Sequence, residues 1–151
     1  MYKIVIIGAG VIGLSIARAI SENSKDSVLI IEKEESYGRG ISSRNSEVVH
    51  SGIYYEPNSL KASYSTLGRD LIYDFCKKNH VWYKNCGKLI VGNKYQSSAL
   101  ESLYKNAKSN NVPDIRIIDK KEIQKLEKNV DSDIALYVGS TGIVSAHDLM
   151  T

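Results

Sequence analysis

Three closely spaced glycines near the amino terminus constrain the fold more than any other feature. Gly8, Gly10 and Gly13 form the pattern G-x-G-x-x-G directly after the apolar run Lys3–Ile7, which predicts a strand buried on both faces of a parallel sheet. The first glycine of this pattern makes a tight turn, the second lets the backbone approach a pyrophosphate, and the third lets the following helix pack closely. We therefore expect a helix from about Val11 whose amino-terminal amides face phosphate groups.

A glutamate follows the next predicted strand. Val28–Ile31 is apolar, and Glu32 stands at its carboxyl end, about 20 residues beyond the last glycine, where an acid accepts hydrogen bonds from an adenosine ribose. Glycine triplets alone also occur as simple turn and packing glycines, but here strand, spacing, helix and acid agree. The acid disfavours NADP and leaves FAD and NAD open. We expect Val11, Ile12 and Lys33 to join this site.

A loop with many polar side chains follows the acid. Residues 36–45 are rich in glycine and serine, and Ser42 or Ser43 is predicted to cap a short helix through Val48–His50. One interpretation is a capped surface loop, and the other is a second group of cofactor contacts. The candidates for cofactor binding here are Ser42, Ser43, Arg44, Asn45 and Ser46.

The composition of the chain limits the classes of protein to which it can belong. The chain has 151 residues, 42% of them hydrophobic and 25% charged, as in one ordinary globular domain, and its net charge of +3 does not suggest nucleic acid or a membrane surface as partner. No run approaches a membrane span, and the first strand begins too near Met1 to leave room for a signal or transit peptide. Two cysteines, Cys76 and Cys86, indicate neither a disulfide framework nor a metal site. We expect a cytoplasmic protein, with peripheral attachment to a membrane left open.

The remainder of the chain predicts alternating helices and short strands. Leu60, Tyr64, Leu67, Leu71 and Phe75 recur at helical spacing and are expected to face the core. The expected elements are a helix over 59–78, a strand pair or bent strand over 81–92 around Gly87, a helix over 96–110, a strand over 115–118, a helix capped by Asp119, a strand over 134–138 and a helix beginning at Ser145. Because only two strands of the parallel sheet are visible, we expect the fold to be incomplete in this chain.

Several segments together resemble one family. The stretches IIGAGVIGLSIARAI, IIEKE, RNSEVVHSGIYYEPNSLKA, CGKLIVG and ALYVGSTGIVSAHDL resemble the amino-terminal part of the L-2-hydroxyglutarate dehydrogenase/oxidase family, within the FAD-dependent D-amino-acid-oxidase-like superfamily. The resemblance implies an α/β fold, with a Rossmann-type FAD-binding βαβ unit and the start of an α+β substrate domain with antiparallel strands. It divides the chain into an FAD-binding segment (1–80), the start of the substrate domain (81–140) and a return towards the FAD domain (141–151).

The resemblance also implies a chemistry. Members of the family oxidise L-2-hydroxyglutarate, a small 2-hydroxy acid, to 2-oxoglutarate with FAD, and the electron acceptor stays open between a quinone and oxygen. His50 is the candidate base for the hydroxyl proton, because an imidazole titrates near neutrality, although it could instead be a neutral pocket residue. Arg44 could place charge near the flavin or a carboxylate. Tyr54, Tyr55 and Lys88 are candidates for the substrate side.

Two departures and two alternatives remain beside this resemblance. Ser145 stands where members often have an acid, and Ser42, Ser43 and Arg44 lie in a variable stretch, so individual contacts are open. One alternative is another superfamily enzyme with the same cofactor, such as a glycerol-3-phosphate or amino-acid oxidase. The other is a truncated, inactive product.

Overall fold

The computed structural model describes residues 2–151, and these residues form two compact units. The first unit comprises the residues up to Glu47 together with Ser145–Thr151, and the second comprises Val48–Val144. Both helices and strands are present, with one parallel strand pair and two antiparallel sheets, so the predicted mixed α/β class is confirmed. The functional division at residues 80 and 140 stays a prediction.

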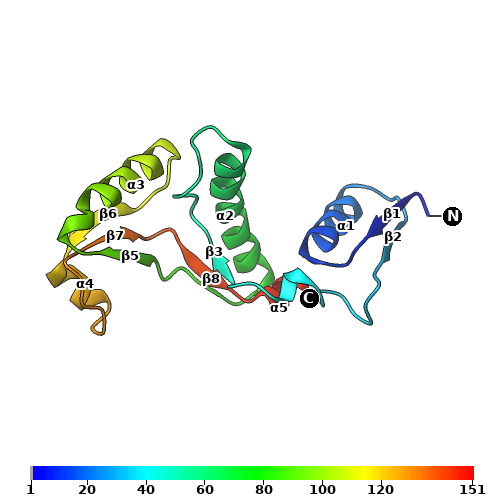
Figure 1. Cartoon of the computed structure of the whole chain (residues 1–151). Coiled ribbons are helices and arrows are strands. Elements are labelled where there is room, and N and C mark those ends of the chain that lie inside the picture. Colours follow the sequence, from blue (N-terminus) through cyan, green and yellow to red (C-terminus); the bar gives the residue numbers. More distant parts are fainter. Residues whose placement is uncertain (1) are drawn as a thin grey trace. The chain divides into compact units, whose positions relative to one another are not determined.

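The first unit is built on a parallel strand pair covered by one long helix (Figure 1). Strand β1 (Ile4–Ile7) pairs with β2 (Val28–Ile31) in a register that places Ile4 opposite Val28. Helix α1 (Val11–Asn23) connects them, as the glycine pattern predicts. The 3-10 helix η1 (Ile41–Ser43) and helix α5 (Ala146–Met150) complete the unit.

The last seven residues are tied to the loop that follows β2. Gly38 has a positive φ of 70°, and a Cβ on it would lie 2.7 Å from Cε of the buried Met150. The amide of Ala146 donates a hydrogen bond of 2.8 Å to the Glu47 carboxylate, and the hydroxyls of Tyr37 and Thr151 lie 3.4 Å apart. Chain segments about a hundred residues apart in sequence therefore hold this loop in place.

The second unit contains two antiparallel sheets of three strands each, in the orders β3-β8-β4 and β5-β7-β6. Its helices lie against these sheets in Figure 1. In chain order the elements are β3 (Val48–Val49), α2 (Leu60–Asn79), β4 (Tyr83–Lys84), β5 (Lys88–Gly92), η2 (Lys94–Gln96), α3 (Ser97–Ser109), β6 (Ile115–Asp119), α4 (Lys120–Leu126), β7 (Ile134–Val138) and β8 (Gly142–Val144).

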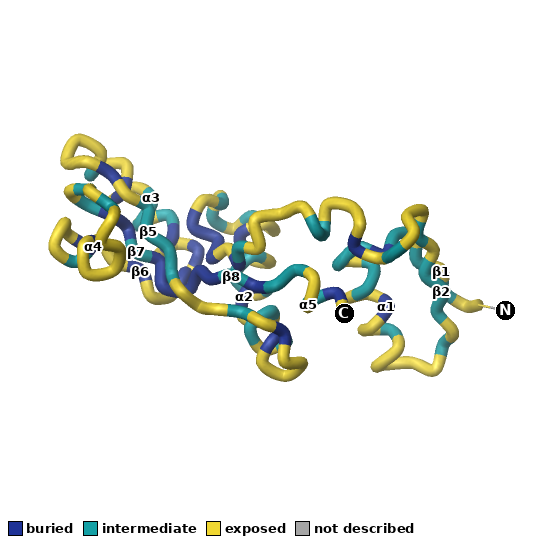
Figure 2. The backbone as a smooth tube through the Cα atoms, turned by 90° about the horizontal axis from the view of Figure 1, so that it is seen from below, coloured by how far each residue is buried: buried dark blue, intermediate teal, exposed yellow. Residues whose placement is uncertain are grey.

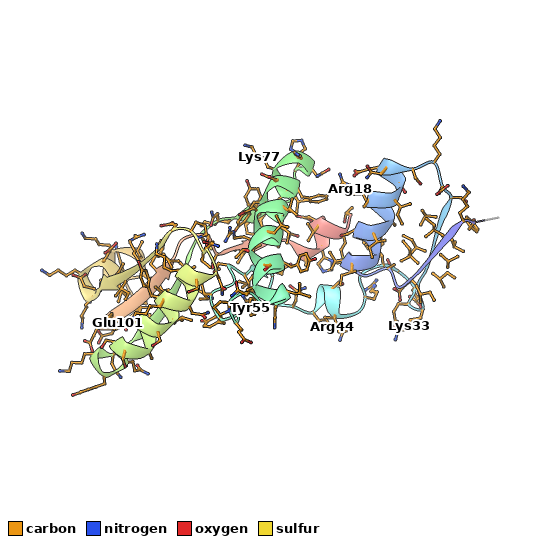
Figure 3. All side chains as sticks on the ribbon, turned by 90° about the horizontal axis from the view of Figure 1, so that it is seen from above. Arg18, Lys33, Arg44, Tyr55, Lys77 and Glu101 are labelled. Carbon is orange, nitrogen blue, oxygen red and sulfur yellow. The ribbon has the colours of Figure 1, made fainter. Side chains whose placement is uncertain are left out.

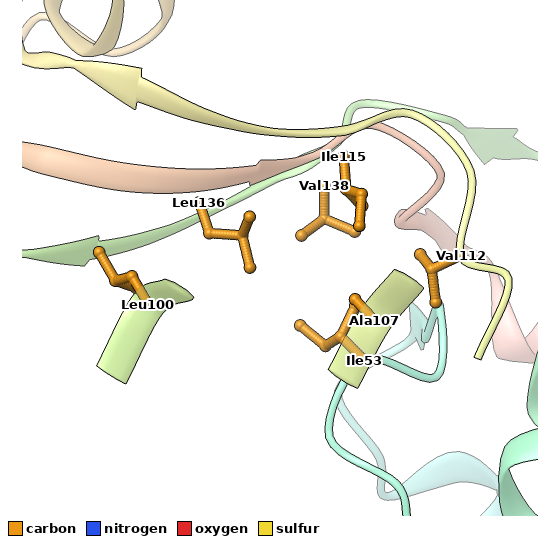
Figure 4. Packing of buried hydrophobic residues seen from close by; sticks show 7 residues of the cluster. All are labelled: Ile53, Leu100, Ala107, Val112, Ile115, Leu136 and Val138. Carbon is orange, nitrogen blue, oxygen red and sulfur yellow. The ribbon is translucent and has the colours of Figure 1, made fainter. Parts of the chain in front are cut away.

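The largest described core lies between α3 and the sheet β5-β7-β6. Leu136 and Val138 on β7 are completely buried and pack with Leu100 and Ala107 of α3 (Figure 4). The other members of this cluster are Ile53, Val112 and Ile115. Figure 2 shows the same distribution along the backbone, with buried segments concentrated in the second unit and exposed segments prevailing around β1 and β2. The second unit therefore supplies most of the buried apolar surface.

Two predicted helix starts are confirmed in atomic detail. The side chain of Asp119 accepts a hydrogen bond from the amide of Glu122, and that of Ser145 accepts one from Asp148. A side-chain oxygen in this position satisfies one of the amides that a helix leaves unpaired at its start. Such local chemistry is readable from sequence, and the predicted helices begin within one residue of these caps.

The prediction of a helix through Val48–His50 is wrong. Val48 and Val49 form strand β3, paired with Ile143 and Gly142 of β8, a strand that the sequence pattern did not reveal. The β-branched valines favour a strand once a partner is available, and that partner is more than ninety residues away. The strands around Gly87 were predicted as a pair or one bent strand, but β4 pairs with β8 whereas β5 pairs with β7.

Two predictions of buried apolar residues are also wrong within the described chain. On β1, expected to be buried on both faces, the side chain of Ile7 is 88% exposed. On α2, the apolar stripe expected in the core is exposed, with Leu60 at 74%, while the helix turns Ala62, Arg69 and Cys76 inward. Helical spacing identifies the stripe but not what covers it.

The close contact inside the glycine turn yields a stability prediction. A Cβ at Gly13 would collide with the backbone carbonyl oxygen of Gly8, whereas a Cβ at Gly68, in the middle of α2, meets nothing. Gly13→Ala should destabilise the chain by about 1–3 kcal/mol, because the collision is with backbone. Gly68→Ala should be neutral or stabilise by up to about 1 kcal/mol, as alanine does in an open helix position. Urea unfolding followed by circular dichroism measures both, and equal responses would contradict the contact.

Candidate functional site

The glycine turn brings the carboxyl ends of β1 and β2 close to the start of α1. Gly8 has a backbone φ of 101°, which residues that carry a side chain rarely adopt. Its amide donates a 2.7 Å hydrogen bond to the carbonyl of Ile31. Gly13 packs directly on the Gly8 carbonyl. The turn is therefore shaped by the strand-helix contact itself, and it leaves the first amides of α1 directed away from the sheet.

The start of α1 is open to an anion except for one serine. Gly10 is the N-cap residue and has no side chain to offer, while the amide of Val11 donates a 3.0 Å hydrogen bond to Oγ of Ser42. A Cβ on Gly10 would lie 2.9 Å from the same hydroxyl oxygen. Helix amino termini of this kind bind phosphate through backbone amides and the helix dipole. Ser42 thus lies over the helix start where a pyrophosphate would bind.

Glu32 is held in place by backbone amides. Its Oε2 accepts a 2.7 Å hydrogen bond from Ala9, and its Oε1 accepts bonds of 2.9 and 3.1 Å from Lys33 and Glu34. These donors, Ala9 foremost, hold the pKa of Glu32 below its ordinary value, so the side chain stays ionised. A carboxylate has about four acceptor positions, and three are used here, which leaves capacity for a ribose hydroxyl.

These groups surround a cavity of about 410 Å³ within the first unit. Its volume lies in the range of small-molecule sites, and glycine backbone, apolar side chains and one carboxylate line it, a combination suited to an adenosine diphosphate group. Lining residues are Ile7, Gly8, Gly10, Ile31, Glu32, Lys33, Glu34, Gly38, Gly40, Ile41 and Ser42. Gly8 and Gly10 have no Cβ atoms, and Glu32 is held by backbone amides. The residues present therefore fit the adenosine part of a dinucleotide.

The predicted cofactor residues fall into two groups. Gly8, Gly10, Glu32, Lys33 and Ser42 line the cavity, and Val11 and Gly13 shape its rim through the contacts above. The others lie outside the lining. Ser43 donates to the carbonyl of Gly40, Asn45 donates to the carbonyl of Ser42, and the side chains of Ile12, Arg44 and Ser46 are exposed.

Figure 3 labels Lys33 after β2 and Arg44 after η1, the two cationic side chains predicted for this site. Sequence reasoning missed Gly38 and Gly40 as lining residues. Their signal was present, because a second pair of glycines in the stretch YGRG follows the acid by only a few residues. Gly38 needs its positive φ, and both glycines keep the cavity wall free of side chains.

In the second unit, the predicted residues Tyr54 and Lys88 form a small cluster. The ammonium group of Lys88 lies 4.9 Å from the ring centre of Tyr54, and its charge acts on the imidazole of His50. Partial burial first, and the charge of Lys88 second, lower the pKa of His50, while burial lowers the pKa of Lys88. The imidazole is therefore neutral at lower pH than an ordinary histidine and can accept a proton. Tyr55 does not join the cluster, since its ring lies 4.6 Å from Nζ of Lys61.

Neither a metal centre nor a membrane-spanning helix is found among the described residues. Within residues 2–151, no group of three or more histidine, cysteine or acidic side chains could hold a metal ion, and Cys76 and Cys86 are free thiols. Over the same residues, no helix combines the length and apolar character that crossing a membrane requires. The candidates for function in the described chain are the glycine-lined cavity, His50, and the contact between Tyr54 and Lys88.

Comparison with known proteins decides the family. A family model described as FAD dependent oxidoreductase matches residues 3–151. The chain belongs to this family. FAD is thus the cofactor, and the alternative of NAD is set aside. A solved member, L-alpha-glycerophosphate oxidase from Mycoplasma pneumoniae with FAD bound, superposes with a TM-score of 0.88 at 29% identity, covering 97% of this chain and 40% of that one.

Two similar curated proteins have the same designation. L-2-hydroxyglutarate dehydrogenase of Dictyostelium discoideum is 40% identical over 148 residues, covering 95% of this chain and 33% of the relative. The human protein of the same name is 39% identical over 145 residues, covering 95% of this chain and 31% of its own. Glycine oxidase of Geobacillus kaustophilus shares the fold, with a TM-score of 0.85 at 22% identity. This chain spans about a third of the length of the curated relatives.

The predicted cytoplasmic location is contradicted. Both of these relatives are named as mitochondrial proteins, and this finding speaks against the expected cytoplasmic location. Cysteine content, on which the prediction partly rested, describes the reducing character of a compartment and does not identify the compartment.

Substitution of Gly10 should affect cofactor binding and not folding. Gly10 has an ordinary φ of −78°, and an added Cβ meets only the movable Ser42 hydroxyl, so Gly10→Ala should fold normally. Because that Cβ lies where the backbone approaches the pyrophosphate, the variant should lose FAD. FAD content by absorbance and the thermal midpoint of the apoprotein measure the two effects. Full FAD content in Gly10→Ala would remove the pyrophosphate from this position.

Proposed function

We propose that this chain is the FAD-binding and substrate-binding portion of an enzyme that oxidises L-2-hydroxyglutarate to 2-oxoglutarate. The observation that carries the proposal is 39–40% identity, over 95% of the chain, to proteins named L-2-hydroxyglutarate dehydrogenase. The lowered pKa of His50, caused by partial burial and by the charge of Lys88, supports it, because a hydroxy acid needs a proton acceptor and a positive group for its carboxylate.

The cofactor-binding roles follow from the first unit. The amides at the start of α1 and the bare backbone of Gly8 and Gly10 hold the diphosphate, and Glu32 accepts hydrogen bonds from the ribose hydroxyls. Ser42 exchanges its hydrogen bond from Val11 for a contact with phosphate. Ser43, Asn45 and Ser46 stabilise or extend the loop that carries Ser42, and Arg44 adds positive charge nearby.

The reaction removes a hydride from C2 and a proton from the C2 hydroxyl, so two electrons leave with the hydride. Bound FAD supplies the hydride acceptor. His50 takes the hydroxyl proton as the bond to oxygen becomes a carbonyl, and its lowered pKa keeps the imidazole in the accepting form. Tyr54 and Tyr55 follow His50 closely in the chain. Tyr54, whose ring centre lies 4.9 Å from the Lys88 ammonium group, is the better placed of the two to contact substrate.

A second substrate is favoured by one structural observation. The solved relative with a TM-score of 0.88 and 29% identity is an L-alpha-glycerophosphate oxidase, whose substrate carries a phosphate and no carboxylate. Oxidation of glycerol 3-phosphate would need the same base and the same hydride acceptor. Chemistry at the hydroxyl therefore does not distinguish the two substrates. The enzyme must distinguish them by their anionic groups, a carboxylate or a phosphate.

A direct test follows flavin reduction by each substrate. When L-2-hydroxyglutarate is mixed anaerobically with the FAD-loaded enzyme, it should reduce nearly all of the flavin. The loss of flavin absorbance should occur within the time of one catalytic turnover. Glycerol 3-phosphate and glycine should leave the band nearly unchanged over the same interval, and D-2-hydroxyglutarate serves as the stereochemical control. Faster bleaching by glycerol 3-phosphate would replace the proposed substrate with the second candidate.

His50 should control the proton step without affecting cofactor content. His50→Asn should lower the rate of flavin reduction by about 10²- to 10⁴-fold, the usual contribution of a general base, while FAD remains bound. Because its pKa is lowered, activity of the parent enzyme should be lost only as the pH falls below the ordinary histidine value of about 6.5. That acid limb should be absent in the variant. A near-parent rate in His50→Asn would make His50 a structural residue.

A further inference from the structure

A short segment of the second unit is buried although the side chains on both sides of it reach solvent. Ser51 and Ile53 are each only 1% exposed, and Gly52 between them is buried. His50 before this segment and Tyr54 after it have exposed side chains. Buried backbone outside helices and strands must find other hydrogen-bond partners, because it has lost those that water supplies. The partners of this segment therefore decide how firmly the two exposed residues are held.

Two asparagines supply these partners from α3 and the residue that follows it. Nδ2 of Asn106 donates hydrogen bonds of 2.8 and 2.9 Å to the carbonyls of Ile53 and Tyr55. Nδ2 of Asn110 donates bonds of 3.0 and 2.8 Å to the carbonyls of Gly52 and Tyr55. An amide nitrogen has two donor hydrogens, so both side chains use all of theirs on this one segment. Asn106 and Asn110 together are called the asparagine clamp below.

The helix itself does not explain the asparagine clamp. Asparagine is a weaker helix former than alanine, because its side chain competes for backbone hydrogen bonds. The spacing of four residues places Asn106 and Asn110 on one helix face, and Asn110 is only 7% exposed. A buried amide is tolerated where its polar atoms are paired, and the pairing here is with residues 52–55. The clamp is therefore placed for the segment and not for the helix.

The same segment is held at two further points. Oγ1 of Thr141, in the turn between β7 and β8, donates a 3.1 Å hydrogen bond to Oγ of Ser51, and both residues are buried. Ile53 belongs to the large core cluster together with Ala107 of α3 (Figure 4). With carbonyls, a hydroxyl and an apolar side chain all engaged, the backbone of the segment is fixed. Only the side chains that flank it are left free to rotate.

We infer that Asn106 and Asn110 are positioning residues, which fix this segment so that His50 and Tyr54 keep one orientation toward the substrate. The inference rests on the proposed function, in which His50 takes the hydroxyl proton and Tyr54 contacts the substrate. Neither asparagine needs to touch the substrate. A displacement of about 1 Å in a reacting group can lower a rate by about 10²-fold, so a loosened segment should affect the rate more than the affinity.

Substitution of Asn106 tests the clamp, because this half-buried side chain is easier to replace than that of Asn110. Asn106→Ala should lower the rate of flavin reduction at saturating L-2-hydroxyglutarate by roughly 10- to 100-fold, and should change the dissociation constant of the substrate by less than about 3-fold. FAD content should equal that of the parent. Asn106→Gln keeps both donor hydrogens and should recover part of the rate.

Ser132→Ala is the matched control. It also removes side-chain hydrogen bonds to backbone in the second unit, but these go to the carbonyls of Gly92 and Ile134, where the pairing of β5 with β7 ends. This variant should reduce its flavin at the parent rate. Equal rates in Asn106→Ala and Ser132→Ala would overturn the inference. A loss of affinity as large as the loss of rate, or no recovery in Asn106→Gln, would show a binding or packing role only and would overturn it as well.

Hydrogen exchange separates this inference from the proposed function. In Asn106→Ala the amides of residues 51–55 should exchange roughly 5- to 30-fold faster than in the parent, as expected for the loss of two hydrogen bonds, while those of β7 keep the parent rate. Unchanged exchange overturns the inference, whatever the substrate is. If glycerol 3-phosphate reduces the flavin and L-2-hydroxyglutarate does not, the proposed substrate fails. The rates of the same variants are then compared with glycerol 3-phosphate, and the inference stands or falls by that ratio.

Discussion

The close approach of Gly13 to the carbonyl of Gly8 is the contact on which the first unit depends. It allows α1 to lie against β1 and β2, which in turn places the helix start beside the carboxyl end of β2 and brings Glu32 within 2.7 Å of the Ala9 amide. Each group of the cavity follows from this geometry: bare backbone at Gly8 and Gly10, free amides at the start of α1, and a carboxylate fixed by three backbone donors. A side chain at position 13 would separate strand and helix, and these groups would no longer converge.

Burial is distributed unevenly between the units. In the second unit, Leu136 and Val138 are covered by α3, which gives that unit a core of its own. In the first unit, apolar side chains of β1 and α1 such as Ile7 and Ile12 are 88% and 73% exposed, and the stripe on α2 is exposed as well. Exposed apolar surface of this extent is unusual for a complete globular protein. It accords with a chain that spans about a third of its relatives' length, and it explains why helical spacing alone assigned Leu60 and Leu71 to a core.

Local signals predicted most of the helices and the glycine turn, because caps, periodicity and G-x-G-x-x-G act over a few residues. Asp119 and Ser145 cap helices as their spacing indicates, and Gly8, Gly10, Glu32 and Ser42 do line one cavity. Nonlocal pairing was not predictable in the same way. The assignment of Val48 and Val49 to a strand depends on β8, and the assignment of β4 and β5 to different sheets depends on β8 and β7. Arg44 and Ser46 were predicted from polarity alone, which does not determine the direction of a side chain.

The two polar sites stabilise their charges in opposite ways, and this difference bears on their chemistry. Glu32 is a carboxylate surrounded by backbone donors, so its charge is permanent and its role is to accept hydrogen bonds. His50 is an imidazole held neutral by partial burial and by a neighbouring cation, so its charge is the variable that a reaction can change. A cofactor site benefits from the first arrangement, because binding should not depend on pH near neutrality. A proton acceptor requires the second, because a group that is already charged cannot take the proton. The electrostatics thus suit the glycine-lined cavity to cofactor binding and the imidazole of His50 to proton transfer.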